Sequence, residues 1–375
     1  MNRFFTSESV TEGHPDKVCD RIADAILDAH IKRDPYSHVA CEVTACTDKV
    51  HLMGEITSRA HGNYENIVRR VIHDVGYTED ETGFDDKTCD ITVDFHEQSP
   101  DIARGVSRVN DMISGAGDQG IMFGYACRET ENYMPVAFEL ASKLTKRLSY
   151  VRQMQTLPFL RPDGKAQVTV EYKNGIPKRI DTVVLSAQHN ESIFEEELKL
   201  ALMDSVILPT LPMDMLDRNT KYLINPTGRF VLGGPAADSG LTGRKIIADT
   251  YGGAARHGGG AFSGKDPSKV DRSAAYMARY LAKNIVAGEL ADRCEVQLAY
   301  AIGVKEPVSV SVETFGTEKA PVPEIERLIQ KRADLTPFGI ITRFDLRRPI
   351  YEQLSCYGHF GINAAEMPWE QLDWV

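Results

Sequence analysis

Apolar and polar residues follow a helix pattern, two strand patterns and a second helix pattern, and this order occurs three times along the 375-residue chain. In the first unit, apolar residues recur every three to four positions from Asp16 to Arg33, as expected for a helix with one buried face. Strand-like alternation follows in HVACEVTAC and KVHLMGEIT, and the helical period returns in YENIVRRVIHDV. The three units begin near residues 16, 135 and 272.

This recurrence predicts an α+β fold of three similar modules, each an antiparallel or mixed sheet with helices on one face. The second unit contains PVAFELASKLTKRL, AQVTVEY, RIDTVVLSAQ and ESIFEEELKLALMDSVI, and the third contains RSAAYMARYLAKNIVA, CEVQLAYAIG, PVSVSVET and PEIERLIQKR. The stretches DKVCDRIADA and SKVDRSAAYMA also resemble each other when one gap is allowed. The alternative is chance, because any α+β protein produces such alternation.

Charge and composition exclude two kinds of partner. The net charge of −11 argues against a nucleic-acid-binding protein, which needs a basic face. No apolar run approaches the roughly 20 residues that a membrane helix needs. Seven cysteines without C-x-x-C spacing favour reduced, mostly buried thiols and a cytoplasmic protein.

Two segments depart from the modular pattern. Residues 96–120 lack periodicity and form a connection far longer than the usual four to six residues, which is typical of a functional loop. Residues 225–272 hold more than a third of the chain's 29 glycines. Because glycine is costly in chain entropy, this enrichment predicts a function.

The stretch GAGDQG at 115–120 matches the G-x-G-x-x-G pattern of a dinucleotide-binding turn. Such a turn follows a buried strand and opens a helix, whereas strand-like IMFGYACRE follows here. We therefore do not expect NAD binding. The segment is either a flexible turn or a turn that holds Asp118 at a site.

The stretch GGGAFSGKD at 258–266 reads G-x-x-x-x-G-K from Gly259, with Asp266 where a P-loop has Ser or Thr. The upstream ADTYGGAARHG is not the buried strand that a P-loop NTPase needs, so phosphate binding by convergence is the favoured interpretation. The neighbouring charged residues predict either a polyphosphate site with carboxylates for metal or a solvated loop. They are Arg244, Lys245, Arg256, Lys265, Lys269, Arg272, Asp238, Asp249, Asp266 and Asp271.

The segment TSESVTEGHPDK places His14, Asp16 and Lys17 at the start of the first predicted helix. Unpaired N–H groups and the helix dipole favour an anion there, and Asp16 could ligate magnesium. The alternative is that Asp16 only caps the helix and that His14 is a surface residue.

Four motifs together resemble the S-adenosylmethionine synthetase (methionine adenosyltransferase) family, namely GHPDK, GAGDQG, GLTGRKIIADTYGG and GGGAFSGKDPSKVDRSAAY. The resemblance covers essentially the whole chain. It implies three similar α+β domains about a pseudo-threefold axis, at 1–101, 115–232 and 233–375, with a mobile active-site loop at 98–108. It also implies a homodimer with shared active sites, paired into a dimer of dimers.

The reaction implied by the resemblance joins L-methionine to ATP and then splits the released tripolyphosphate into pyrophosphate and phosphate. The attacking thioether sulfur has no proton to lose, so a general base is not needed, and His14 is better suited to donate a hydrogen bond to the departing oxygen. Mg²⁺ and K⁺ are the implied cofactors. The alternatives are a P-loop-like ATPase or kinase and a non-catalytic nucleotide-sensing oligomer.

The resemblance also implies roles for individual residues. The catalytic set is His14, Lys165, Arg244, Lys245, Lys265 and Asp118. The ATP contacts are His14, Asp163, Lys165, Arg229, Phe230, Asp238, Arg244, Lys245, Ala261 and Lys265. The methionine contacts are Glu55, Gln98, Asp238 and Lys269, the magnesium ligands are Asp16 and Asp271, and the potassium ligand is Glu42.

One position departs from the family pattern. The family usually has glycine directly before the aspartate of this segment, and the chain has Ala237 before Asp238. If that position needs a positive φ, Ala237 strains the turn and shifts Asp238.

Overall fold

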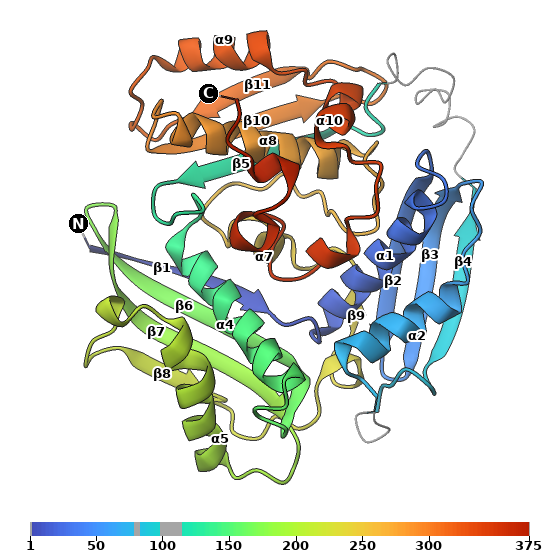
Figure 1. Cartoon of the computed structure of the whole chain (residues 1–375), viewed down its shortest axis with the longest axis vertical. Helices are drawn as coiled ribbons and strands as arrows, with labels where there is room; N and C mark the ends of the chain where they lie inside the picture. The colour runs from blue at the N-terminus through green and yellow to red at the C-terminus, as the bar shows by residue number, and fades with distance from the viewer. Residues whose placement is uncertain (1, 79–82, 98–114, 375) are drawn as a thin grey trace.

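The computed structural model describes residues 2–78, 83–97 and 115–374 (Figure 1). The active-site loop expected at 98–108, including Gln98, lies outside these residues. Figure 1 shows three sheets around the centre of the molecule, with long helices packed against them.

The predicted order of helix, strand, strand and helix is present in all three units. The first has α1 (Pro15–Ile31), β2 (His38–Cys46), β3 (Lys49–Thr57) and α2 (Tyr64–Val75). The second has α4 (Val136–Gln153), β6 (Leu160–Lys173), β7 (Ile176–His189) and α5 (Glu195–Leu202). The third has α8 (Val270–Ala287), β10 (Arg293–Tyr300), β11 (Ser309–Glu313) and α9 (Val322–Arg332).

Further strands complete the three sheets. The added strands are β1 (Asn2–Val10), β4 (Asp90–His96), β5 (Gly120–Cys127), β8 (Lys221–Ile224) and β9 (Gly240–Leu241). The strand orders are β4-β3-β2-β9, β8-β7-β6-β1 and β11-β10-β5. The pairs β3–β4 and β7–β8 are parallel and the other pairs are antiparallel, so two sheets are mixed and one is antiparallel.

The three units exchange strands in a cycle. Strand β1 directly precedes the first unit but pairs with β6 of the second, and β5 precedes the second unit but pairs with β10 of the third. Strand β9 precedes the third unit and pairs with β2 of the first. Each sheet therefore combines strands from two of the ranges 1–101, 115–232 and 233–375, and this equivalence supports the pseudo-threefold arrangement. Those range boundaries stay a prediction.

The first helix of each unit covers the same part of its own sheet. Helix α1 packs on β2 and β9, α4 on β6 and β1, and α8 on β10 and β5. Shorter helices complete the fold, namely η3 (Met203–Ile207), α6 (Leu208–Thr210), α7 (Ile246–Asp249) and α10 (Pro337–Phe344). Trp369 closes the core of the third unit by stacking on Tyr276, with ring centroids 3.9 Å apart.

The cysteines are mostly buried, as predicted. All seven cysteines are free, and Cys46 is exposed while the other six are buried. Among the described residues, each helix is too short or too polar to cross a membrane. Helix α1 is unusual because Asp16, Lys17, Asp20 and Asp24 are buried in it together with its apolar side chains.

Candidate active site

Pairing of β1 with β6 brings His14 beside Lys165. Val10 lies opposite Lys165 in the register, and the Thr11 amide donates to the Gly164 carbonyl at 2.9 Å. Gly13 then packs so closely on Pro162 that a Cβ would lie 2.3 Å from its carbonyl carbon. The chain can approach β6 this closely because residue 13 is glycine.

His14 is the N-cap of α1, and its Nδ1 accepts a hydrogen bond from the Asp16 amide at 3.2 Å. Burial and the positive charges of Lys245 and Lys165 lower the pKa of His14 to about 3. The ring is therefore neutral at pH 7. Because Nδ1 is an acceptor, the proton of the neutral ring lies on Nε2, which is a hydrogen-bond donor.

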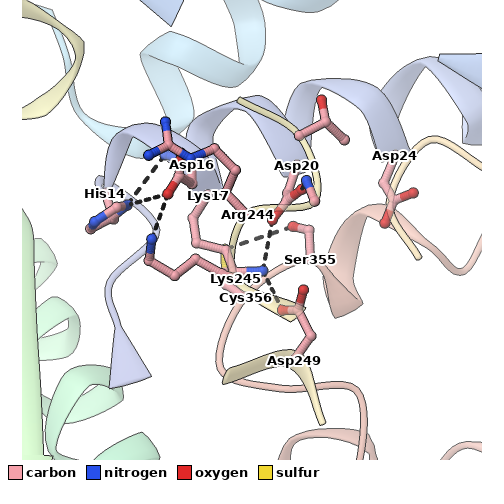
Figure 2. Close-up of polar contacts among 12 residues, drawn as sticks. His14, Asp16, Lys17, Asp20, Asp24, Arg244, Lys245, Asp249, Ser355 and Cys356 are labelled. Atoms are coloured by element: carbon pink, nitrogen blue, oxygen red, sulfur yellow. Dashed lines mark hydrogen bonds and ion pairs between the residues drawn. The ribbon is translucent and has the colours of Figure 1, made fainter. Parts of the chain in front are cut away.

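Asp16 fixes the segment that carries two predicted phosphate contacts (Figure 2). Its Oδ1 accepts from the Leu241 amide at 3.0 Å, and its Oδ2 pairs with the Lys245 ammonium. The Arg244 guanidinium lies 3.9 Å from Oδ1. Burial raises the pKa of Asp16, but hydrogen bonds from Lys245 and Leu241 outweigh it and hold the pKa below its usual value.

A second group of predicted residues lies at the start of α8. The Lys265 ammonium is 2.7 Å from Asp271 Oδ2, and a Cβ on Gly260 would lie 2.2 Å from Asp271 Oδ1. Lys269 pairs with Asp266, whose Oδ2 also accepts from the Val39 amide at 2.7 Å. Asp266 thus connects the loop to β2.

Helix α1 joins the two groups. Asp24 forms a bidentate pair with Arg272, with N···O distances of 2.7 and 2.8 Å. Glu42 lies between the groups: burial, Asp20 and Glu55 raise its pKa, although the nearby Lys265 lowers it. The predicted phosphate and metal residues therefore form one connected polar region.

Asp163 is a buried carboxylate with spare binding capacity. Its Oδ2 accepts from the Gly234 amide at 2.9 Å, while its Oδ1 is buried without a hydrogen-bond partner among the described residues. Burial raises the pKa of Asp163 to about 6. Such an unpaired oxygen fits a ligand that supplies a hydrogen-bond donor.

The remaining predicted ATP contacts are exposed or half-buried. Arg229 is exposed and pairs with Glu191, and the Phe230 amide donates to His189 Nε2 at 3.1 Å. Asp238 is exposed, and Ala261 lies in the glycine-rich loop.

The predicted methionine contacts are more scattered. His96 Nε2 lies 3.2 Å from Glu55 Oε1, and Asp118 is exposed with its Oδ1 accepting from the Gln119 amide at 2.7 Å. Strand β5, not a helix, follows GAGDQG, so the dinucleotide-turn geometry is absent from this described segment. Gly120 nevertheless brings this turn to Asp271, because a Cβ there would lie 3.2 Å from Oδ1.

The loop 258–266 differs from a P-loop in the use of its amides. The amides of Gly259, Gly264, Lys265 and Asp266 donate to protein acceptors, so they are not directed at an anion. Attraction for phosphate must then come largely from the Lys265 ammonium.

Ala237 does not strain its turn. Its φ is −99°, an ordinary value for any L-residue, and the positive φ of the segment, +63°, is at Gly234. The condition for a shifted Asp238 is therefore not met.

Sequence analysis missed the buried carboxylates Asp20 and Asp24. The signal was present, because aspartates recur every four residues at 16, 20, 24 and 28 and this spacing places them on one side of a helix. The segment was predicted to be a helix from its apolar positions alone, so the spacing of its aspartates was not considered.

The charges of the site suit a ligand that carries several phosphates, as expected of an enzyme with a polyphosphate substrate. A neutral imidazole donor, several cations and two carboxylates surround the start of α1, in three similar α+β units.

Comparisons with known proteins identify the family. Models of the S-adenosylmethionine synthetase N-terminal, central and C-terminal domains match residues 2–100, 113–230 and 232–371. The S-adenosylmethionine synthase of Clostridium tetani is 56% identical over 382 residues, covering 100% of this chain and 98% of the relative. The chain therefore belongs to the S-adenosylmethionine synthetase family.

Membership confirms three predictions from the sequence, namely the family, the three-domain α+β fold and the class of enzyme, a methionine adenosyltransferase. Enzymes of this family use ATP and depend on metal ions. The P-loop alternative is wrong, because the matched domains and the sheets belong to a different fold.

Proposed function

We propose that this chain makes S-adenosylmethionine by attack of the methionine sulfur on the 5′ carbon of ATP, and that it then hydrolyses the tripolyphosphate to pyrophosphate and phosphate. The observation that carries the proposal is the neutral His14 beside Lys165 and Lys245. A neutral donor surrounded by cations suits an oxygen that gains negative charge as it leaves.

Each group has a defined task in the displacement step. His14 Nε2–H donates to the departing oxygen, and Lys165, Arg244, Lys245 and Lys265 attract the phosphates. One pair of unit charges 4 Å apart is worth about 4 kcal/mol at an effective dielectric of 20, so several cations stabilise the leaving group strongly. Alignment of sulfur, carbon and leaving oxygen supplies further acceleration.

Asp16 and Asp271 are the proposed Mg²⁺ ligands. Magnesium in phosphate sites is usually held by one or two carboxylates together with substrate phosphates and water. These carboxylates fit, because each lies beside a proposed phosphate-binding lysine, Lys245 or Lys265. A bound Mg²⁺ supplies positive charge to the phosphates.

Glu42 is the proposed K⁺ ligand. It is partly buried near Asp20 and Glu55, and a cation would relieve the repulsion among these carboxylates.

The proposed methionine contacts are Glu55, Gln98, Asp238 and Lys269, and Asp118 belongs to the proposed catalytic set. Asp118 and Asp238 are exposed in the single chain, and the dimer implied by the family resemblance would have a second copy complete the site. We propose this dimer, a dimer of dimers and a cytoplasmic location.

A product assay tests the proposal. Purified protein with ATP, methionine, Mg²⁺ and K⁺ should form S-adenosylmethionine, pyrophosphate and phosphate in equal amounts, and omission of methionine should abolish S-adenosylmethionine. ATP binding without any product would indicate a nucleotide sensor. Phosphate release that does not depend on methionine would indicate an ATPase.

A further inference from the structure

Four aspartates of α1 hold backbone amides from three other parts of the chain. Asp16 accepts from Leu241 at 3.0 Å, Asp20 from Gly243 at 2.9 Å and Asp24 from Gly264 at 2.8 Å. Asp28 accepts from Tyr351 at 3.1 Å and from Glu352 at 2.9 Å. Helix α1 thus sets the positions of these loops along its own axis.

Lys17 fixes the orientation of Asp20 (Figure 2). Lys17 is 1% exposed, and its ammonium lies 2.8 Å from Asp20 Oδ2 and also pairs with Asp249. Asp20 therefore uses one oxygen for Lys17 and the other for the Gly243 amide. Gly243 has a φ of +75° and directly precedes Arg244 and Lys245, so its anchoring determines where both cations project.

Asp24 and Arg272 hold the other phosphate-binding segment in the same way. Besides its pair with Asp24, Arg272 Nη1 donates to the carbonyls of Phe262 and Lys265 at 3.0 and 3.3 Å. Asp24 itself accepts from Gly264, next to Lys265. The two buried pairs therefore serve two different loops.

We propose that Lys17 and Asp20 are positioning residues for Arg244 and Lys245, and that Asp24 and Arg272 are positioning residues for Lys265. This inference rests on the proposed function, because it takes those three cations as the tripolyphosphate site. In this proposal, none of the four positioning residues contacts the substrate.

Asp28 offers a matched control on the same helix. It is only partly buried, but it holds backbone amides as the other aspartates do, and Tyr351 and Glu352 carry no proposed phosphate contact. Burial raises the pKa of Asp28 to about 7. Replacing it by neutral asparagine is therefore a mild change.

The test compares Asp20→Asn, Asp24→Asn and Asp28→Asn by calorimetric titration with tripolyphosphate and Mg²⁺, and by steady-state kinetics. Because a 1 Å misplacement can cost about 100-fold, we expect Asp20→Asn and Asp24→Asn to weaken tripolyphosphate binding by about 10- to 100-fold. KM for methionine should change less than about twofold, and Asp28→Asn should bind tripolyphosphate as the unmodified chain does.

Double substitutions separate positioning from general damage. Asp20→Asn should add little further loss in a Lys245→Ala background, whereas Asp24→Asn should add its full effect there. Equal tripolyphosphate affinity of Asp20→Asn and the unmodified chain, or full additivity of Asp20→Asn with Lys245→Ala, would overturn the inference. If Asp20→Asn does not fold, Asp249→Asn takes its place, because it removes a charged partner of Lys17. We then expect the Kd for tripolyphosphate to rise about threefold, and an unchanged Kd would contradict the inference.

The unmodified chain distinguishes the two proposals. Tripolyphosphate binding without S-adenosylmethionine formation would contradict the proposed function and leave the positioning inference intact. Product formation by the unmodified chain, with unaltered tripolyphosphate binding in Asp20→Asn and Asp24→Asn, would support the proposed function and contradict the positioning inference.

Discussion

Helices α1 and α8 begin in the same way, position by position. The second residue of each helix is an aspartate that pairs with a lysine outside the helix. Asp16 pairs with Lys245, which follows α1 in sequence, and Asp271 pairs with Lys265, which precedes α8. The third residue of each is a buried cation, Lys17 or Arg272, that pairs with an aspartate of α1.

The two helix starts differ in the N-cap and in exposure. The N-cap of α1 is the neutral, buried His14, whereas that of α8 is Lys269, which pairs with Asp266. The Asp16 side chain is 3% exposed and that of Asp271 is 15% exposed. The two helix starts thus present different groups, a neutral imidazole at one N-cap and an ammonium at the other.

The largest expected effect is on stability, at the buried cations. Lys17→Met and Arg272→Met should each lower the free energy of unfolding by about 3 to 5 kcal/mol, because each leaves buried carboxylates without a counter-charge. Urea unfolding measures this loss. If either substitution left the free energy of unfolding unchanged, the buried cation would not stabilise both helix starts in the same way.

The next effect is on activity, at the lysine beside Asp271. Lys265→Ala should lower kcat by about 100- to 1000-fold, since it removes positive charge where the leaving group develops. The lysine is partly exposed, so unfolding free energy should fall by only about 1 kcal/mol. Activity and stability losses of similar size would contradict a role in phosphate binding.

The N-caps should differ in what their loss impairs. His14→Ala should slow single-turnover displacement by about 100-fold with methionine affinity nearly unchanged, because a donor to the leaving oxygen is lost. Lys269→Ala should mainly raise KM for methionine. An unchanged single-turnover rate in His14→Ala would refute the leaving-group role.

Lowering pH should destabilise the start of α1. His14 has a folded pKa of about 3, below its unfolded value near 6.5, so the unfolded state binds more protons in this window. Its contribution to stability is retained above pH 6.5 and lost as pH falls toward 3, with a loss of about 2 kcal/mol between pH 7 and 5. Unfolding of His14→Asn, which keeps a helix-capping side chain, should show a correspondingly smaller pH dependence.

The smallest effect is expected at the position that departs from the family. Ala237→Gly should change KM for methionine by less than about twofold, because φ at this residue is already unstrained. A large fall in KM would show that the alanine does displace Asp238.

Periodicity was sufficient to predict the two main helices and the two hairpin strands of each unit, because both depend on local patterns. It could not predict the cyclic exchange of β1, β5 and β9, since strand pairing joins segments far apart in sequence. The proximity of His14 to Lys165 follows from that exchange. The family resemblance therefore predicts that these residues share a site, whereas the residue pattern alone does not.

The two helix starts illustrate a second limit. Sequence similarity aligned Lys17 with Lys269 across a gap, whereas the helix boundaries align Asp16 with Asp271 and Lys17 with Arg272. The condition for strain at Ala237 is likewise not met, because the positive φ belongs to Gly234. Both cases depend on the position of a residue within its element, which spacing alone does not determine.

The most direct test of the central claim is a rapid-quench single turnover with ATP labelled at the γ-phosphate. If the α1 site releases tripolyphosphate as one leaving group, S-adenosylmethionine and labelled tripolyphosphate should appear together, and labelled phosphate should follow. Labelled phosphate that precedes S-adenosylmethionine would contradict the account.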